Sequence, residues 1–316
     1  MTALASTGRG TSLAFAALVL AIATFSCSAV NPASETFASH IAAPEHESGD
    51  AVVVAAGDIA SCESEGDEAT ADLLARTDGT VLTLGDNVYD DGTLEEFTDC
   101  YGPSWGRYKH HTKPSPGNHD YNSEGAEGYF DYFGREAIGD PDEGYYSYDL
   151  GAWHLIVLNS NCAEVGGCDA SSPQVRWLET DLAENAEERC TLAYWHHPLF
   201  SSGEEHGSTP EVKPLWEALY EAGADVVLSG HEHNYERFAP QDADGEANPE
   251  RGIREFVVGT GGKSHYPILD PIANSEVHND DTYGVLVLTL RPEGYEWRFV
   301  PIEGERFADS GSARCH

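Results

Sequence analysis

The stretch "VVLSGHEHNYERF", residues 226–238, joins an apolar run to a turn that holds two histidines. Residues 226–228 are typical of a buried strand, and Gly230 is typical of the turn that follows one. His231 and His233 are two residues apart, so on an extended backbone they lie on the same side. Two imidazoles on one side can each offer a nitrogen to a metal ion. An H-x-H in a surface turn is also common without any function, so the rest of the chain has to decide.

The same pattern, an apolar run followed by Gly, Asp, Asn or His, occurs five times. The carboxyl ends of strands in α/β sheets form the crevice where ligands bind, so we expect these clusters to converge. An Asp after a strand is often only a turn residue or a helix cap. It is improbable, however, that all five clusters lack a function. The clusters are Gly57-Asp58, Gly85-Asp86-Asn87-Val88-Tyr89, Gly117-Asn118-His119-Asp120, His196-His197-Pro198 and Gly230-His231-Glu232-His233.

The side chains of these clusters offer carboxylate, amide, imidazole and phenol groups. Such a mixture suits Fe, Zn or Mn, whereas Ca²⁺ takes oxygen ligands only. The candidate ligands are too many for one ion. Two ions about 3.5–4 Å apart, bridged by one carboxylate, would use all of them and would bind a phosphoryl group. The sequence therefore predicts a two-metal site for phosphate chemistry.

Strands and helices alternate through most of the chain, which predicts an α/β fold. We expect one helix to begin at Ser172-Pro173, because Pro is favoured in a first turn, and another over residues 211–222 that ends at Gly223. Residues 256–302 lack the helical pattern and are predicted to form a meander of strands. The predicted strands are residues 51–56, 81–84, 154–158, 191–195, 225–228, 255–258 and 285–290.

The first 30 residues are typical of an export signal. Arg9 supplies positive charge, residues 13–25 are uncharged and mostly apolar, and small residues follow. Cleavage near this point is one option, and lipid attachment at Cys27 is the other. No later stretch is long and apolar enough to span a membrane, so we expect a secreted, periplasmic or lipid-anchored cell-surface protein. Residues 31–50 are predicted to be a linker, and residues 51–316 a single domain.

Removal or lipidation of Cys27 leaves six cysteines, an even number that suits disulfides in an exported protein. Six cysteines allow 15 pairings, and spacing alone does not choose among them. The pairing that we favour is Cys62–Cys100, Cys162–Cys168 and Cys190–Cys315. The chain has no C-x-x-C pair, which argues against a thiolate zinc site.

The chain carries 55 acidic and 17 basic residues, a net charge of −38. Such a surface repels nucleic acid and anionic membranes, so neither is an expected partner. It also repels phosphorylated molecules at long range. Two cations at the predicted site would create the local positive charge that a phosphorylated substrate needs.

The five motifs, in this order, resemble the calcineurin-like metallophosphoesterases and, within them, the purple acid phosphatases. Most of that superfamily has a D-x-H in the first motif, but here Asp58 is followed by Ile59 and Ala60. The purple acid phosphatases carry a tyrosine in a G-D-x-x-Y instead, and Tyr89 stands in that place. The similarity covers roughly residues 50–302, and we expect the small single-domain form. It implies a catalytic domain built as an α/β/β/α sandwich, two mixed β-sheets flanked by helices.

The resemblance also implies a role for each motif residue. Two ions would be bound, an Fe³⁺ and a divalent Fe, Zn or Mn. The first would be held by Asp58, Tyr89 and His233, the second by Asn118, His196 and His231, and Asp86 would bridge them.

Further histidines of the chain are assigned on the same resemblance. His119 would stabilise the phosphate, and His206, ten residues after His196, would bind substrate and protonate the leaving group. We choose His196 over its neighbour because the family pattern is His-x-Pro, and we expect His197 to face the other way. His265 could also approach the site from its glycine-rich loop.

The resemblance implies an exported phosphatase in which a metal-bound hydroxide attacks small phosphate monoesters. Two alternatives stay open. One keeps the site but acts on phosphodiesters or nucleotides, and the other binds metal or phosphate without catalysis. The oligomeric state is not predicted.

The acid-rich, lysine-poor composition also suits a high-salt habitat. At about 1 M salt the Debye length is only ~3 Å, so self-repulsion of the acidic surface largely disappears. We expect the melting temperature to rise between low and molar salt, as followed by circular dichroism. A melting temperature that stays the same or falls would contradict this origin of the charge.

Overall fold

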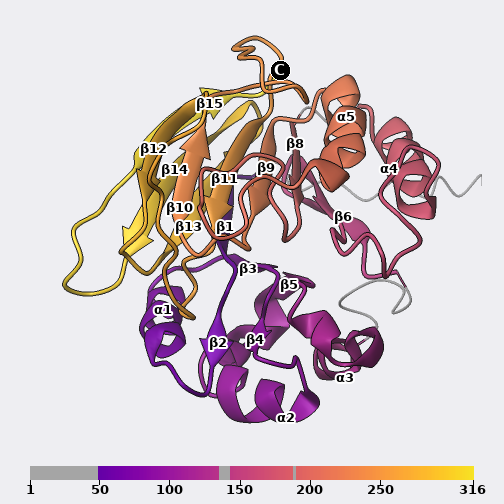
Figure 1. Cartoon of the computed structure of the whole chain (residues 1–316). Helices are drawn as coiled ribbons and strands as arrows, with labels where there is room; N and C mark the ends of the chain where they lie inside the picture. Colours follow the sequence, from indigo (N-terminus) through magenta and orange to yellow (C-terminus); the bar gives the residue numbers. More distant parts are fainter. Residues whose placement is uncertain (1–48, 135–142, 188–189) are drawn as a thin grey trace, which may run out of the picture. The chain divides into compact units, whose positions relative to one another are not determined.

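Short apolar runs form the strands of two mixed β-sheets in the computed structural model, which describes residues 49–134, 143–187 and 190–316 (Figure 1). The predicted export signal, Cys27 and most of the predicted linker lie outside the described residues. The first sheet has six strands, in the order β15 (Ser310–Arg314), β14 (Gly294–Pro301), β13 (Gly284–Arg291), β1 (Ala51–Ala56), β3 (Thr80–Leu84) and β5 (Thr112–Ser115). The second has seven, in the order β12 (Ser275–Asn279), β10 (Tyr235–Phe238), β11 (Arg254–Val258), β9 (Val226–Ser229), β8 (Cys190–Tyr194), β7 (Trp153–Val157) and β6 (Tyr146–Leu150).

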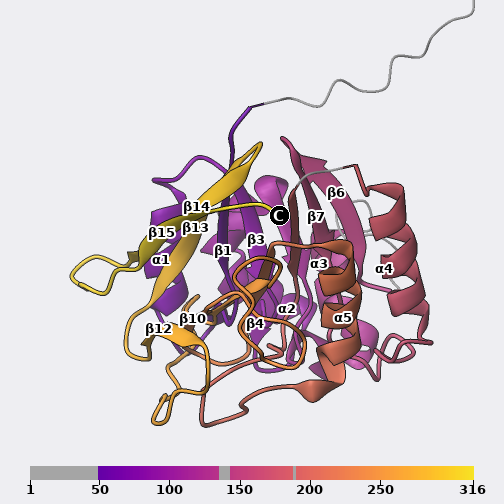
Figure 2. The ribbon, with the colours of Figure 1, turned by 90° about the horizontal axis from the view of Figure 1, so that it is seen from above.

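The side-chain alternation of the seven-stranded sheet decides what covers each of its faces. On β7, Leu155 and Val157 point into the core shared with the six-stranded sheet, whereas Ile156 belongs to a second apolar cluster. That second cluster lies under α4 (Pro173–Glu184) and α5 (Lys213–Ala222), which lie side by side on the outer face (Figure 2). The other helices are α1 (Gly66–Leu74), which packs against β13, α2 (Leu94–Glu96) and α3 (Glu127–Phe133).

Local signals set the ends of the two outer helices. The Ser172 hydroxyl accepts the N–H of Val175 at 3.3 Å, and Pro173 occupies the first turn of α4. Gly223 ends α5 with a left-handed φ of 83°, a conformation that costs other residues strain. Residues Pro210–Val212 form a 3-10 turn, so α5 begins slightly later than predicted.

The predicted α/β sandwich is confirmed, and all seven predicted strands are present, each displaced by at most one residue at either end. The predicted meander over residues 256–302 is wrong in part. Of its strands, β11 and β12 belong to the seven-stranded sheet, and only β13 and β14 form an antiparallel meander, which β15 continues beyond residue 302. The reason is that β11 pairs in parallel with β9, which draws it away from the strands that follow.

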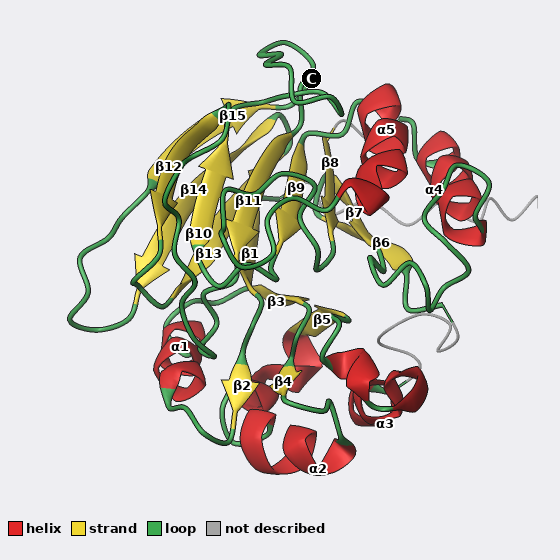
Figure 3. Cartoon of the chain, in the orientation of Figure 1, coloured by secondary structure: helices red, strands yellow, loops and turns green. Residues whose placement is uncertain are grey.

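Parallel pairing brings the motif residues to one edge of the sheets. β1, β3 and β5 run parallel, as do β7, β8 and β9, so the loops that leave their carboxyl ends lie together. Two-residue strands β2 (Ala60–Ser61) and β4 (Val88–Tyr89) pair beyond this edge. Figure 3 shows this pair near α2 and α3, next to β3 and β5.

The three favoured disulfides, Cys62–Cys100, Cys162–Cys168 and Cys190–Cys315, are all present. The last of them fastens the chain end to the start of β8. Among the described residues, no helix is both long and apolar enough to cross a bilayer.

The imidazole of His154, on β7, is buried between two carboxylates. Its Nδ1 lies 2.8 Å from Asp149 on β6, and its Nε2 lies 2.7 Å from Asp181 on α4. Burial alone would lower the pKa of His154, but the hydrogen bonds with Asp181 and Asp149 outweigh it and raise the pKa above its usual 6.5. This stabilisation is therefore complete below the unfolded-state pKa and is lost as the pH rises through the raised pKa of the folded state.

We expect His154→Gln to lower the melting temperature more at about pH 6 than at about pH 9, because only the charged imidazole binds both carboxylates. Thermal unfolding followed by circular dichroism measures both values. The exposed His278→Gln is the control, for which we expect little change at either pH. An equal loss for His154→Gln at both pH values would show that the charge does not matter.

Candidate metal centre

The hydroxyl of Tyr89 is the centre of a first group of donor atoms. It lies 2.9 Å from Oδ1 of Asp58, 2.9 Å from Oδ2 of Asp86 and 3.2 Å from Nε2 of His233. All four side chains are buried, with at most 3% of each exposed. A hydroxyl has one hydrogen, so it cannot donate to both carboxylates at once, and the group holds more acceptors than donors.

Nε2 of His196 is the centre of a second group. It lies 3.1 Å from Oδ1 of Asn118, 3.1 Å from Nδ1 of His231 and 3.3 Å from Oδ2 of Asp86. Oδ2 of Asp86 is therefore common to both groups. The structure thus brings together all seven residues that the sequence predicted as metal ligands.

Hydrogen bonds from outside the groups orient two of the histidines. Nδ1 of His196 donates to the carbonyl of Leu84 at 2.8 Å, and Nδ1 of His233 lies 2.6 Å from the hydroxyl of Ser264. In each ring the other nitrogen, Nε2, faces the donor groups. Metal-binding histidines are usually held by such a second hydrogen bond.

The charges of this cluster suit cations. Burial raises the pKa of Tyr89 well above 10, and the charges of Asp58 and Asp86 raise it further. Burial also opposes ionisation of Asp86, but the charge and hydrogen bond of His196 lower the pKa of Asp86 below its usual range. Burial lowers the pKa of His196, yet Asp86 raises it to about 9. The mixed O and N donor set fits Fe, Zn or Mn.

Three of the seven residues have left-handed backbone conformations that are uncommon outside glycine. The φ angles are 60° at Asp58, 47° at Asp86 and 70° at His231. Such strain persists only where the surrounding structure imposes it, and it is frequent at functional sites. Each of these residues directly follows a glycine that ends a strand motif.

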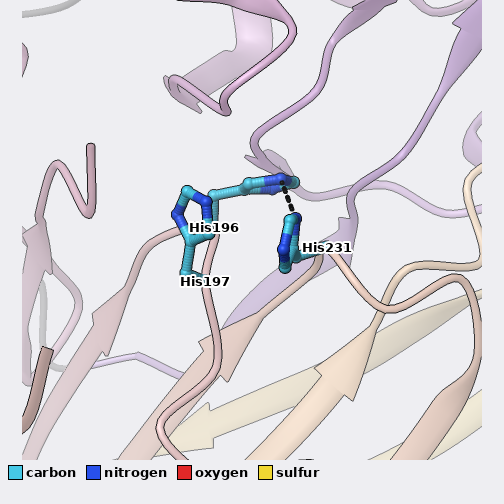
Figure 4. Close-up of side chains that lie close together, drawn as sticks. All are labelled: His196, His197 and His231. Atoms are coloured by element: carbon cyan, nitrogen blue, oxygen red, sulfur yellow. Dashed lines mark hydrogen bonds between the residues drawn. The ribbon is translucent and has the colours of Figure 1, made fainter. Parts of the chain in front are cut away.

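The sequence predicted that His197 faces away from His196 and the site, and this prediction is wrong. Its ring lies 4.3 Å from that of His231 and 4.9 Å from that of His196, between ring centroids (Figure 4). The physical reason is that β8 ends at Tyr194 and the chain bends at both histidines, so the two adjacent side chains are not held on opposite sides. Nδ1 of His197 is bound to the hydroxyl of Ser160 at 2.8 Å, which leaves His196 as the histidine that meets Asp86.

His119 and His206 flank the two donor groups. The His119 ring packs 4.4 Å from the ring of Tyr89, and the backbone N–H of His119 donates to Oδ1 of Asp86 at 2.8 Å. The exposed His206 ring stacks 4.1 Å from the ring of His231. His265 instead packs on Tyr283, and its neighbour Tyr266 stacks 3.9 Å from His233.

The sequence reasoning missed two buried acids that support the site. Glu232 lies between the two histidines of the last motif, and its Oε1 accepts the N–H groups of His206, at 2.7 Å, and of Gly207. Asp120 accepts the N–H of Gly117 at 2.8 Å and the side-chain amide of Asn87 at 2.9 Å, which fixes the Asn118 loop. Both acids stand inside the sequence motifs, and this position is the signal that could have identified them.

Gly85 permits the close approach of His196. Its φ is 81°, and a Cβ on it would lie 2.5 Å from Nδ1 and 2.6 Å from Cβ of His196. We expect Gly85→Ala to displace His196 and to bind clearly less metal than the wild type. The measurement is metal per chain by mass spectrometry after expression with Fe and Zn or Mn, with circular dichroism to check the fold.

Gly223→Ala is the matched control. Its φ is 83° and no atom lies within 4 Å of the added Cβ, so it imposes the backbone strain without the steric contact. We expect this variant to keep its metal. If Gly85→Ala also kept its full metal content, the position of His196 would not matter for binding.

Relatives of the chain are acid phosphatases. Purple acid phosphatase 15 of Arabidopsis thaliana is 30% identical over 199 residues, which cover 52% of this chain and 37% of that protein. Acid phosphatase type 7 of Homo sapiens is 29% identical over 146 residues, 40% of this chain and 32% of that protein. The chain thus spans about a third of the length of these relatives.

Solved structures share the fold. The purple acid phosphatase PPD1 from yellow lupin (Lupinus luteus) seeds has a TM-score of 0.67 at 17% identity, over 84% of this chain and 54% of that one. GAP50, described as the anchor in the inner membrane complex of Plasmodium, has a TM-score of 0.61 at 15% identity, over 84% and 89%. The model of the calcineurin-like phosphoesterase family matches residues 34–235. The chain therefore belongs to the calcineurin-like phosphoesterases, a family of phosphoric-ester hydrolases, and has purple acid phosphatases among its relatives.

Proposed function

We propose that the chain is an exported dinuclear-metal phosphatase that hydrolyses phosphate monoesters. The observation that carries this proposal is the pair of donor groups that share Oδ2 of Asp86. Separations of about 3 Å between donor atoms suit ligands that surround one ion at 2.0–2.2 Å. One shared carboxylate oxygen is the arrangement that two neighbouring ions require.

The two groups would hold different ions. Asp58, Tyr89 and His233 would bind Fe³⁺, as the family resemblance implies, and Asn118, His196 and His231 would bind a divalent Fe, Zn or Mn. Asp86 would contact both. When bound, the ions supply positive charge for the phosphate and an activated water molecule.

The histidines that flank the groups suit the remaining steps. Nδ1 of His119 donates to the carbonyl of Asp90 at 2.7 Å, which leaves Nε2 for a phosphate oxygen. His206 lies on the opposite side, next to His231, where it can donate a proton to the leaving oxygen. Glu232 holds the backbone of His206 in place.

Three disulfides support the proposal of export, because they persist in oxidising compartments. We propose residues 1–30 as the signal, with cleavage or a lipid anchor at Cys27, residues 31–50 as the linker and residues 51–316 as the catalytic domain. The protein would be secreted, periplasmic or a cell-surface lipoprotein. Its partner would be a small phosphorylated substrate, because the acidic surface repels nucleic acid.

A second candidate function is binding without catalysis. The fold itself allows this, since GAP50 shares it and is described as an anchor. His119 and His206 favour hydrolysis, because a protein that only binds metal needs neither. A phosphodiesterase or nucleotidase with the same site is the third candidate.

We expect the folded, metal-loaded protein to hydrolyse p-nitrophenyl phosphate faster than bis-p-nitrophenyl phosphate. Asp86→Asn, which keeps the size of the side chain, should lower kcat/KM for the monoester by at least about a hundredfold, since loss of a mere outer-shell partner already costs about 10–100-fold. The exposed Asp270→Asn is the control and should retain full activity. Release of p-nitrophenol and metal content are measured on the same samples.

The other outcomes separate the candidates. Faster turnover of the diester would keep the site and change the substrate to phosphodiesters. Two metals per chain without turnover of either compound would favour the binding protein.

A further inference from the structure

A pocket of about 400 Å³ adjoins the second donor group. Its lining includes Asn118, which belongs to that group, and His197, which lies beside it. Three loops form its walls, those that follow β5, β7 and β8, and all of them leave the carboxyl edge of the sheets. A molecule bound at the metal centre could therefore extend directly into this space.

The walls of this pocket are held in place. Cys162–Cys168 closes the loop after β7, and within it the N–H of Glu164 donates to the carbonyl of Asn161 at 2.9 Å. The loop after β8 is tied by the N–H of Thr209, which donates to the carbonyl of Pro198 at 2.9 Å. The pocket is preformed, so little ordering is needed when a ligand binds.

The charged side chains that line the pocket are acidic. Glu164 and Glu211 are exposed, come from different loops, and have no ion-pair partner within the described parts of the chain. No lysine or arginine is among the described lining residues.

An aromatic ring completes the lining. Tyr121 is partly buried, and its hydroxyl accepts the side-chain amide of Asn159 at 2.8 Å. Glu164 lines the same pocket as Tyr121. Carboxylates beside an aromatic face are the groups that proteins use to bind ammonium ions.

We propose that this pocket binds the alcohol part of phosphate monoesters in which that alcohol carries an ammonium group. The inference rests on the proposed phosphatase function and narrows its substrate class. Glu164 and Glu211 attract the ammonium, whereas a second phosphate or a carboxylate at this place is repelled. Nucleoside polyphosphates and sugar bisphosphates are therefore poor substrates.

The position of the pocket agrees with the chemistry of hydrolysis. The bond between phosphorus and the alcohol oxygen breaks, water supplies the new P–O bond, and one proton goes to the alcohol oxygen. The products are the amino alcohol and inorganic phosphate. The ring of His231 lies 4.1 Å from the ring of His206 and 4.3 Å from the ring of His197, which lines the pocket, so the proposed proton donor is one ring away from the pocket wall.

The test compares two substrates of nearly equal shape, phosphocholine and its uncharged carbon analogue 3,3-dimethylbutyl phosphate. We expect the wild type to prefer phosphocholine roughly five- to twentyfold in kcat/KM, as two partly exposed ion pairs allow. Glu164→Gln/Glu211→Gln should remove most of this preference and leave hydrolysis of p-nitrophenyl phosphate and of the carbon analogue almost unchanged. Both side chains are exposed, so the double variant should fold normally.

Glu184→Gln/Glu187→Gln is the matched control. It removes the same charge from exposed positions at the opposite edge of the sheet, before β8 begins. A preference for phosphocholine that falls equally in both double variants would come from the overall acidity of the protein and would overturn the pocket assignment. Equal kcat/KM for the two substrates in the wild type would overturn it as well.

A binding measurement separates failure of the pocket from failure of the proposed function. Isothermal titration with phosphocholine and its carbon analogue reports their relative affinity without turnover. If p-nitrophenyl phosphate is not hydrolysed but the wild type binds phosphocholine more tightly, and the Glu164/Glu211 variant does not, the phosphatase function fails and the ammonium site stands. If neither binding nor turnover distinguishes the two compounds, the ammonium site is wrong.

Discussion

The buried carboxylate of Asp86 is the interaction on which the rest of the site depends. Its Oδ1 accepts the backbone N–H of His119, and its Oδ2 lies close to both the hydroxyl of Tyr89 and Nε2 of His196. These partners arrive on loops from both sheets, so one side chain fixes how the sheets meet at this edge. Asp86 has a left-handed backbone, and the cost of that conformation is offset by the contacts that it permits. The fold positions the carboxylate, and the carboxylate in turn sets the spacing of both donor groups.

The protein has a net charge of −38, and few of its described basic side chains lie near the donor groups. Bound cations would therefore offset the negative charge most effectively at this place. Lys263 lies close to the site, with Nζ 4.6 Å from the centroid of the Tyr89 ring, and it is already bound to Asp90 at 2.9 Å. On the proposed function, the positive charge that attracts a phosphate would therefore come mainly from the bound ions. The same acidity would make the neighbouring pocket selective, since its described lining offers an anionic group no lysine or arginine.

Much of the fold and of the candidate site could be predicted, because each motif joins an apolar run to residues with a distinct conformational preference. What could not be predicted depends on partners distant in sequence. β10 contains Glu236 and Arg237 and has no apolar alternation, yet it is buried because Arg237 binds Asp309 at 2.7 Å. His197 was misplaced because the His-x-Pro pattern does not show how the chain bends after β8 ends. The support by Glu232 was missed because its loop contacts are invisible in a single sequence.

Glu232 has one consequence for how such a protein matures. It stands between His231 and His233, and it also holds the backbone of the loop that carries His206. Glu232 thus links the segment of the two histidines to the loop of His206, the proposed proton donor. On the proposed function, assembly of the metal ligands and alignment of that proton donor would be one cooperative event rather than two. A chain that has acquired no metal would then also lack an aligned His206. The inactive and active forms would differ in both features at once.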